Sequence, residues 1–201
     1  MIQDIKPSQK LIVGLGSQHT YRSIIAPHTH NRAQLLYASE GAIRVYTADN
    51  VWIVPPQCAL WIPAHIEHSV VSLSEVRLST VLVEKNAANS LGNDCFIVRI
   101  SKLLRELVLR FNQLDYLEFE PNLIESEIEK SLQLLIFHEI KQASSFPIVI
   151  PWPKNPRLIR ICEELMEHPD NPKNLGVWAD QIGTSSRTLI RLFQKETGLN
   201  Y

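Results

Sequence analysis

Two histidines stand one residue apart in the stretch 27–41, PHTHNRAQLLYASEG. His28 and His30 are followed by Gln34 and, after a hydrophobic run, by Gly41. Neutral imidazole is a common ligand of first-row transition metals, and it also hydrogen-bonds small molecules. The spacing alone admits three interpretations: a metal site of an enzyme, the wall of a sensory pocket, or surface histidines near a turn.

A second stretch whose residue types could bind a ligand lies near the C-terminus, where residues 184–195 contain basic side chains and no acid. At 100° per residue one arc of this predicted helix is apolar. The other arc carries the residue types that bond phosphates and base edges, which favours DNA recognition over an ordinary solvated face. Its members are Arg187, Thr188, Arg191, Gln194 and Lys195.

The residues before this helix have the spacing of a helix-turn-helix. Ala179 is small enough for two helices to approach, Gly183 tolerates the positive φ of the turn, and Leu189 provides an apolar anchor on the second helix. Ser185 or Ser186 can cap that helix, because a hydroxyl accepts a hydrogen bond from an unpaired amide at its start.

The composition describes a globular protein. Of its 201 residues 45% are hydrophobic and 20% charged, with a net charge of -1, which argues against a general nucleic-acid coat. There is no signal core or membrane-spanning run, so we expect a cytoplasmic protein. The three isolated cysteines are expected to be reduced. They are Cys58, Cys95 and Cys162.

The elements that position the first histidine pair are predicted to be short strands. Between residues 11 and 100, nine segments rich in β-branched and aromatic residues alternate with turn residues, which indicates a sandwich or small barrel. They are LIVGL, RSIIA, QLLYAS, AIRVYTA, VWIVP, ALWIP, HSVVSL, EVRLSTVLVE and CFIVRI.

Helical periodicity follows from residue 100 to 114 and again from 123 to 143. Leu134 and Phe137 widen the apolar stripe of the second helix, which favours either a thick internal seam or a homodimer interface. Residues 144–156 hold four prolines and are predicted to form an extended connector, followed by a short helix that ends before Pro169.

The C-terminal stretch resembles the first helix-turn-helix of AraC-type transcriptional regulators, because the pattern S-x-R-T-L-x-R-x-F-x-x-E-T-G is intact from Ser185 to Gly198. Members of that family carry two such motifs, and only the first is present in this sequence. The resemblance therefore implies a complete sensory domain and about half of a DNA-binding domain, truncated after the first motif.

Residues 28–68 resemble the paired motifs of the cupin fold. His28, His30, Gln34 and Gly41 fit H-x-H-x3-E-x6-G, and Pro63 and His68 fit P-x-G-x-x-H. In metal cupins the corresponding side chains bind one divalent ion, which here would be zinc, nickel or iron. This chain differs at two places: Gln34 replaces the carboxylate, and His65 replaces a turn glycine. The alternative is a metal-free effector pocket, with candidate wall residues Tyr37, Tyr46, Trp52, Trp61 and His65.

The expected fold class is α+β: a cupin-like double-stranded β-barrel of the jelly-roll type, then dimerisation helices and a small all-α helix-turn-helix segment. We expect an effector-binding barrel at 1–98, dimerisation helices at 99–145, a connector at 146–156 and a partial DNA-binding domain at 157–201. The expected function is transcriptional regulation, with DNA and a metal or small-molecule effector as partners and no membrane. The alternative is a metal-dependent cupin enzyme of the dioxygenase or isomerase type.

Overall fold

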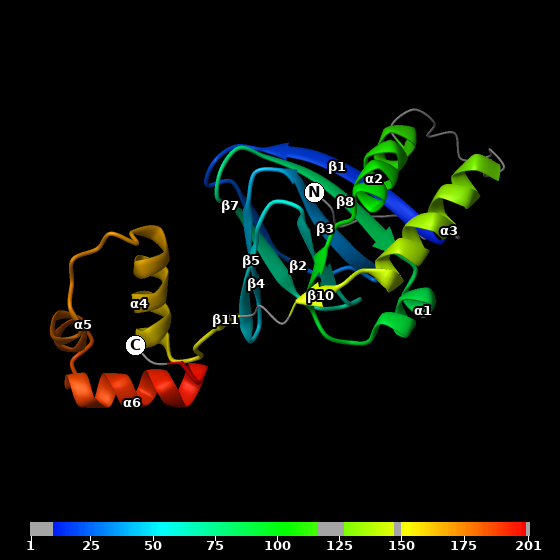
Figure 1. Ribbon diagram of the computed structural model, residues 1–201. Coiled ribbons are helices and arrows are strands. Elements are labelled where there is room, and N and C mark those ends of the chain that lie inside the picture. The colour runs from blue at the N-terminus through cyan, green and yellow to red at the C-terminus, as the bar shows by residue number, and fades with distance from the viewer. Residues whose placement is uncertain (1–9, 116–126, 147–149, 200–201) are drawn as a thin grey trace. The chain divides into compact units, whose positions relative to one another are not determined.

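The computed structural model describes residues 10–115, 127–146 and 150–199, and it has an α+β fold (Figure 1). The chain divides into two compact units. The first comprises 1–47 and 52–149, and the second comprises 48–51 and 150–201. We describe each unit separately.

The first unit is built on two antiparallel sheets, as a cupin-like fold requires. Each of the nine predicted strand segments overlaps one of the strands β1 to β9. The larger sheet has the order β1 (Ile12–His19), β8 (Val76–Val83), β3 (Ala33–Glu40), β6 (Cys58–Ile62), β9 (Phe96–Arg99) and β10 (Ser145–Phe146).

The smaller sheet has the order β5 (Asn50–Val54), β4 (Ile43–Thr47), β7 (His68–Ser72) and β2 (Ile24–His28). A two-residue strand, β11 (Ile150–Pro151), pairs with the start of β5, with Ile150 opposite Val51. The turn between β3 and β4 requires Gly41, which has φ +79°, because a Cβ there would lie 2.2 Å from the Glu75 carbonyl oxygen.

Strand β3 is buried on both faces and separates two cores. Leu35 and Tyr37 point to a core shared with the helices, whereas Leu36 and Ala38 point to the core between the two sheets. This follows from the two-residue period of a strand, which sends successive side chains to opposite faces. Gln34, at an even position, therefore lies on the inter-sheet side.

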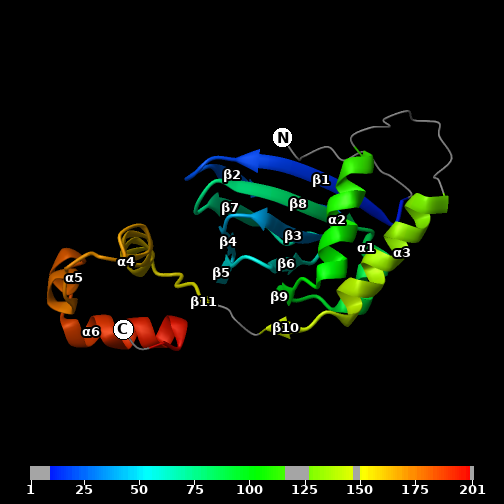
Figure 2. The same ribbon diagram turned by 45° about the horizontal axis from the view of Figure 1, so that its top comes forward.

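Helices α2 (Lys102–Asp115) and α3 (Glu127–Gln142) cover the outer face of the larger sheet (Figure 2). The predicted residues 123–126 of the second helix lie outside the described residues. The buried Gln133 side chain accepts a hydrogen bond from the Ile12 amide at 3.0 Å, which ties α3 to β1. A short helix, α1 (Lys85–Ala88), and the 3-10 turn Asn89–Leu91 were not predicted.

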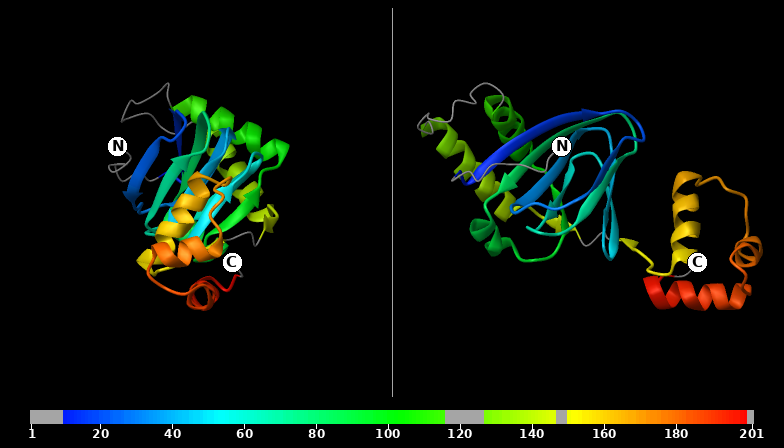
Figure 3. Two further views of the ribbon diagram at one scale, coloured as in Figure 1. Left: turned by 90° about the vertical axis from the view of Figure 1, so that its left-hand side faces the viewer. Right: turned by 180° about the vertical axis from the view of Figure 1, so that it is seen from behind.

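The second unit contains α4 (Pro156–Glu167), α5 (Leu175–Gln181) and α6 (Ser186–Thr197), and the end of α6 lies beside the start of α4 (Figure 3). Their small core includes Leu158, Trp178 and Leu189. Gly183 has φ +68° in the turn between α5 and α6, as the spacing predicted. None of the helices in the described ranges has the length and hydrophobicity needed to cross a bilayer.

Candidate functional site

Three histidines meet at the inner side of the smaller sheet. His28 on β2 and His68 on β7 are directly opposite each other in the antiparallel register, and His30 follows two residues after β2. The ring centroids are 4.8 Å apart for His28 and His30, 4.4 Å for His28 and His68, and 5.3 Å for His30 and His68. The sequence motif therefore becomes one cluster, which we call the histidine cluster.

Backbone carbonyls fix the tautomer of two of these rings. Nδ1 of His28 lies 2.7 Å from the Ala26 carbonyl oxygen, and Nδ1 of His68 lies 2.9 Å from the Ile66 carbonyl oxygen. A carbonyl can only accept, so each Nδ1 carries the proton and each Nε2 has a free lone pair. A backbone carbonyl that accepts from the other ring nitrogen commonly orients a metal-ligating imidazole.

Burial keeps two of the three rings, His30 and His68, uncharged. His30 and His68 are 8% and 2% exposed. Burial lowers the pKa of His68 from 6.5 to about 4, against the opposing effect of the Ile66 carbonyl. Burial, followed by the nearby His28, also lowers the pKa of His30 to about 4. Both rings are therefore neutral at pH 7 and able to donate a lone pair.

Four polar atoms of the cluster have no hydrogen-bond partner among the described residues: Nε2 of His28, His30 and His68, and Oε1 of the buried Gln34. Unpaired buried polar atoms are uncommon, because each one loses its hydrogen bonds to water. The candidate ligand nitrogens lie within 4.8 Å of one another, near the spacing of about 3–4 Å expected around a shared ion. The residues present therefore fit a metal ion.

A cavity of about 20 Å³ adjoins the cluster and lies on the inter-sheet side of β3. Its wall is mostly aliphatic, with two hydroxyl groups. Apart from His28, Gln34 and His68, the lining residues are Leu15, Ser17, Ile25, Leu36, Val70, Leu78 and Thr80. These seven residues were not predicted, since alternating strand residues give no signal that separates a cavity wall from a packed core.

The aromatic residues proposed for the wall lie elsewhere. Tyr37 and Trp61 belong to the core shared with the helices, and Trp52 belongs to the inter-sheet core. The Trp52 indole donates to Thr47 Oγ1 at 3.4 Å, and the half-buried Tyr46 hydroxyl accepts a hydrogen bond from Arg44. None of these four is among the residues that line the cavity.

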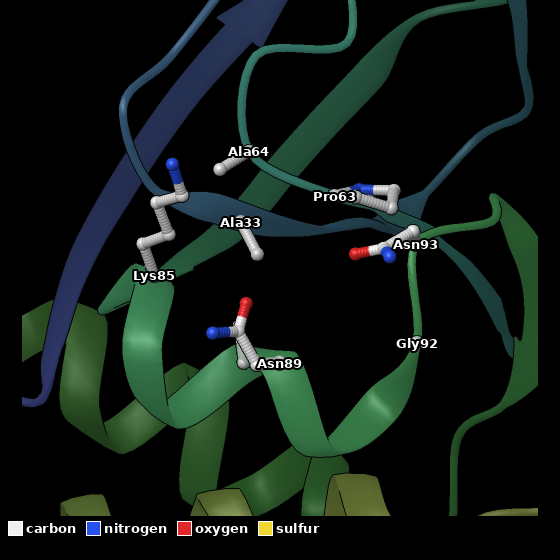
Figure 4. A pocket seen from close by; sticks show the side chains of 8 residues that line it. Ala33, Pro63, Ala64, Lys85, Asn89, Gly92 and Asn93 are labelled. Carbon is white, nitrogen blue, oxygen red and sulfur yellow. The ribbon is translucent and has the colours of Figure 1, made fainter.

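His65 is exposed and outside the histidine cluster, with Nε2 at 3.3 Å from Lys85 Nζ. Its φ of +66° lies in the left-handed region that favours glycine, which is the residue that the cupin motif has at this position. Its amide donates to the His30 carbonyl at 2.8 Å, so this turn positions the backbone of a cluster residue. Beside it is a small surface pocket formed by Ala33, Pro63, Ala64, Lys85, Ala88, Asn89, Gly92 and Asn93 (Figure 4).

The polar arc predicted on α6 is exposed within its own unit. Ser185 caps the helix, with Oγ accepting from the Thr188 amide at 3.2 Å, while Ser186 is its first residue. The helix is held down by Leu189, which is fully buried, and it ends at Gly198 with φ +70°. The predicted polar residues are all exposed: Arg187, Thr188, Arg191, Gln194 and Lys195. Ile190, which belongs to the apolar arc, is exposed as well.

Comparison with known proteins gives a consistent result. The family model described as "AraC-like ligand binding domain" matches residues 12–168. The HTH-type transcriptional regulator NimR of Escherichia coli (strain K12), a regulator by name and not an enzyme, is 32% identical over 175 residues. These cover 87% of this chain and 62% of NimR, so the chain spans less than two thirds of that relative's length.

Two solved structures are similar at low identity. An apo ToxT variant from Vibrio cholerae strain SCE256 matches with a TM-score of 0.49 and 9% identity, over 98% of this chain and 79% of that chain. A cupin superfamily protein from Desulfitobacterium hafniense DCB-2 matches with a TM-score of 0.34 and 11% identity, over 40% of this chain and 84% of that chain.

Proposed function

The chain belongs to the AraC-like ligand binding domain family of transcriptional regulators, and on this premise we propose that it is a cytoplasmic, sequence-specific DNA-binding regulator whose effector binds at the histidine cluster. In this proposal residues 1–98 bind the effector and residues 99–145 form the dimer. Residues 146–156 connect them to the DNA-binding residues 157–201.

The main support for an effector site at the histidine cluster is a set of four unpaired, buried polar atoms beside one cavity. His28, His30 and His68 would hold a divalent transition metal through Nε2, with the Gln34 amide oxygen as a fourth donor. Imidazole and amide donors suit zinc, nickel or iron better than magnesium. The bound ion would supply a Lewis-acidic centre that orders the two strands carrying the histidines.

A metal-free effector pocket is the second candidate, and the fixed tautomers favour one class of ligand for it. The free lone pairs of His28 and His68 can only accept, so such an effector would present hydrogen-bond donors to them. The aliphatic part of the wall would contact its apolar side. This pocket uses the same residues, so one measurement distinguishes the two candidates.

The experiment is elemental analysis of the purified protein together with native mass spectrometry. About one equivalent of zinc, nickel or iron per chain, lost in a variant with His28→Ala and His68→Ala, would support a metal effector. An organic molecule that co-purifies with the chain and is lost in the same variant would support the metal-free pocket. If neither is present and neither binds on titration, the proposed effector site is wrong.

The exposed arc of α6 supports the DNA-binding part of the proposal. Arg187 and Arg191 lie one turn apart and can each form a bidentate contact with guanine, while Lys195 is suited to a phosphate. In the second unit, α4 and α5 pack against the opposite face of α6 around Leu189. This leaves the polar arc as the face available to a DNA groove.

Exposed apolar side chains on α3 support a homodimer. Ile128, Leu134 and Leu135 are 69%, 63% and 48% exposed, although the same helix buries Ile136 and Ile140 against the larger sheet. Large apolar side chains exposed on one helix are typical of a helix that packs against a second copy. We propose that α3 pairs with α3 of a partner chain.

A further inference from the structure

The donor set of the histidine cluster has no negative charge. Its members are three imidazoles and one amide. Within the part of the chain that the structure describes, no aspartate, glutamate or cysteine joins the three histidines. The residues that line the adjoining cavity also include no acid.

This neutrality matters because a divalent ion held there would keep its full charge in surroundings that solvate it poorly. Five of the ten lining residues are aliphatic, and the histidines His30 and His68 are almost fully buried. Burying a charge without a compensating charge is costly. A ligating carboxylate from the protein would offset half of the charge of the ion. In this chain, however, the position where the cupin motif has glutamate is occupied by Gln34, which is neutral.

The adjoining cavity is the place from which an external charge could reach the ion. Its volume of about 20 Å³ is little more than the space of about 10–15 Å³ that a single water needs, so it admits only the smallest anions. The wall also contains two hydroxyl groups. Thr80 is buried, and its hydroxyl can donate to an anion, whereas the exposed Ser17 hydroxyl is 2.8 Å from His19 Nε2. The aliphatic side chains would contact the methyl group of an anion as small as acetate.

We infer that the histidine cluster takes up a divalent transition metal together with a small monoanion, of the carboxylate class, that enters the adjoining cavity. The two bind cooperatively, because each offsets the cost of burying the other. This inference rests on the proposed metal site and adds the chemical class of a second ligand. It is a consequence of Gln34: a glutamate there would make the external anion unnecessary.

Isothermal titration of the metal-free protein with Co²⁺ tests the inference, in a buffer without coordinating anions and with added acetate. Acetamide, the neutral analogue of acetate, is the matched control. We expect acetate to tighten Co²⁺ binding by between about 5- and 150-fold, the usual range for coupled ligands, and acetamide to leave it unchanged. By the same linkage, Co²⁺ should tighten acetate binding by the same factor.

A substitution gives an independent readout. Gln34→Glu should tighten Co²⁺ binding in the absence of acetate and remove the effect of acetate, while Gln113→Glu, on an exposed position of α2, should change neither. Circular dichroism checks that both variants fold. The visible spectrum of Co²⁺ in the unsubstituted chain should change on adding acetate and stay constant in Gln34→Glu.

The outcomes separate the two proposals. If Co²⁺ binds with the same affinity with and without acetate, the anion inference is overturned and the metal site stands. If Co²⁺ does not bind under any of these conditions, the proposed metal site is itself wrong.

Discussion

His28 and His68 form a cross-strand pair whose members use the same local geometry: each donates Nδ1–H to the carbonyl oxygen two residues before it, Ala26 and Ile66 respectively. The backbone of both strands thus fixes the orientation of both rings. Their Nε2 atoms are directed to the cluster without help from a ligand, which is the preorganisation that a binding site requires.

The lowered pKa values of His30 and His68 predict how the stability of the metal-free protein depends on pH. Between pH 6.5 and 4 the unfolded chain binds protons that these buried rings exclude, so the free energy of unfolding falls as the pH drops. Lowering the pKa of His68 from 6.5 to about 4 corresponds to roughly 3 kcal/mol. Urea unfolding followed by tryptophan fluorescence at pH 7.5, 6.5 and 5.5 measures the first part of this decrease, roughly 1 kcal/mol for each of the two rings.

Replacing His68 by glutamine removes one of these titrating groups, so the decrease in stability with falling pH should become shallower. His138→Gln, on an exposed position of α3, should keep the original dependence. Equal unfolding free energies at pH 7.5 and 5.5 in the unsubstituted protein would contradict the burial of neutral imidazoles.

Charged substitutions on α3 should have different effects at the proposed dimer interface and in the core. Leu134 is 63% exposed, so Leu134→Glu should give a folded monomer. Phe137 packs against the buried cluster under α3, so Phe137→Glu should lower the free energy of unfolding by several kcal/mol. Light scattering and thermal unfolding distinguish these results, with Asn86→Glu on α1 as the control.

The interface assignment depends on the unsubstituted chain as well. A monomer at tens of micromolar, or a dimer that persists in Leu134→Glu, would exclude α3 as the contact between subunits.

The cap of α6 gives a matched pair of stability variants. Ser185→Ala removes the side-chain oxygen that accepts from the Thr188 amide and should cost about 1 kcal/mol, whereas Ser186→Ala leaves this bond intact. Thermal unfolding of the two variants measures the difference. Equal losses would show that Ser185 contributes no capping energy.

DNA binding should depend on α6 in two distinguishable ways. Arg187→Ala and Arg191→Ala should each reduce discrimination between sites by roughly 1–3 kcal/mol. Lys195→Ala should weaken binding to all sequences and lower the slope of log K against log salt concentration by about one unit. Fluorescence anisotropy against the protein's own upstream DNA, at several salt concentrations, tests this.

Arg160→Ala removes an exposed charge of the same type from α4 and is the control for a general electrostatic effect. Unchanged sequence preference in both arginine variants of α6 would show that this helix does not read the bases.

The sequence predicted the strands well because turn residues separate them and β-branched residues fill them. The histidine motif was also recognisable, since its spacing survives in the chain. The four-residue helix α1 was missed because it is too short for a helical period to appear. Cap and turn residues such as Ser185 and Gly183 were predictable, because their roles are local.

The wall of the cavity was not predictable for a different reason. Residues 33–38 are all buried, so β3 has no polar face to show which side is which. Tyr37 looked suitable for a pocket but points to the helix side, whereas the less conspicuous Leu36 lines the cavity. The face of β3 that borders the cavity is decided by how the strands pair within the sheets, and this pairing register is a tertiary property.

Metal binding by histidine variants is the most direct test of whether His28, His30 and His68 form a metal site. Titration of the metal-free protein with Zn²⁺ should show one site per chain. His28→Ala and His68→Ala should each weaken it by at least about tenfold, while His19→Ala and His138→Ala keep the original affinity. Unchanged Zn²⁺ affinity in both cluster variants would contradict the account, since the unpaired Nε2 atoms would then not be the ligands.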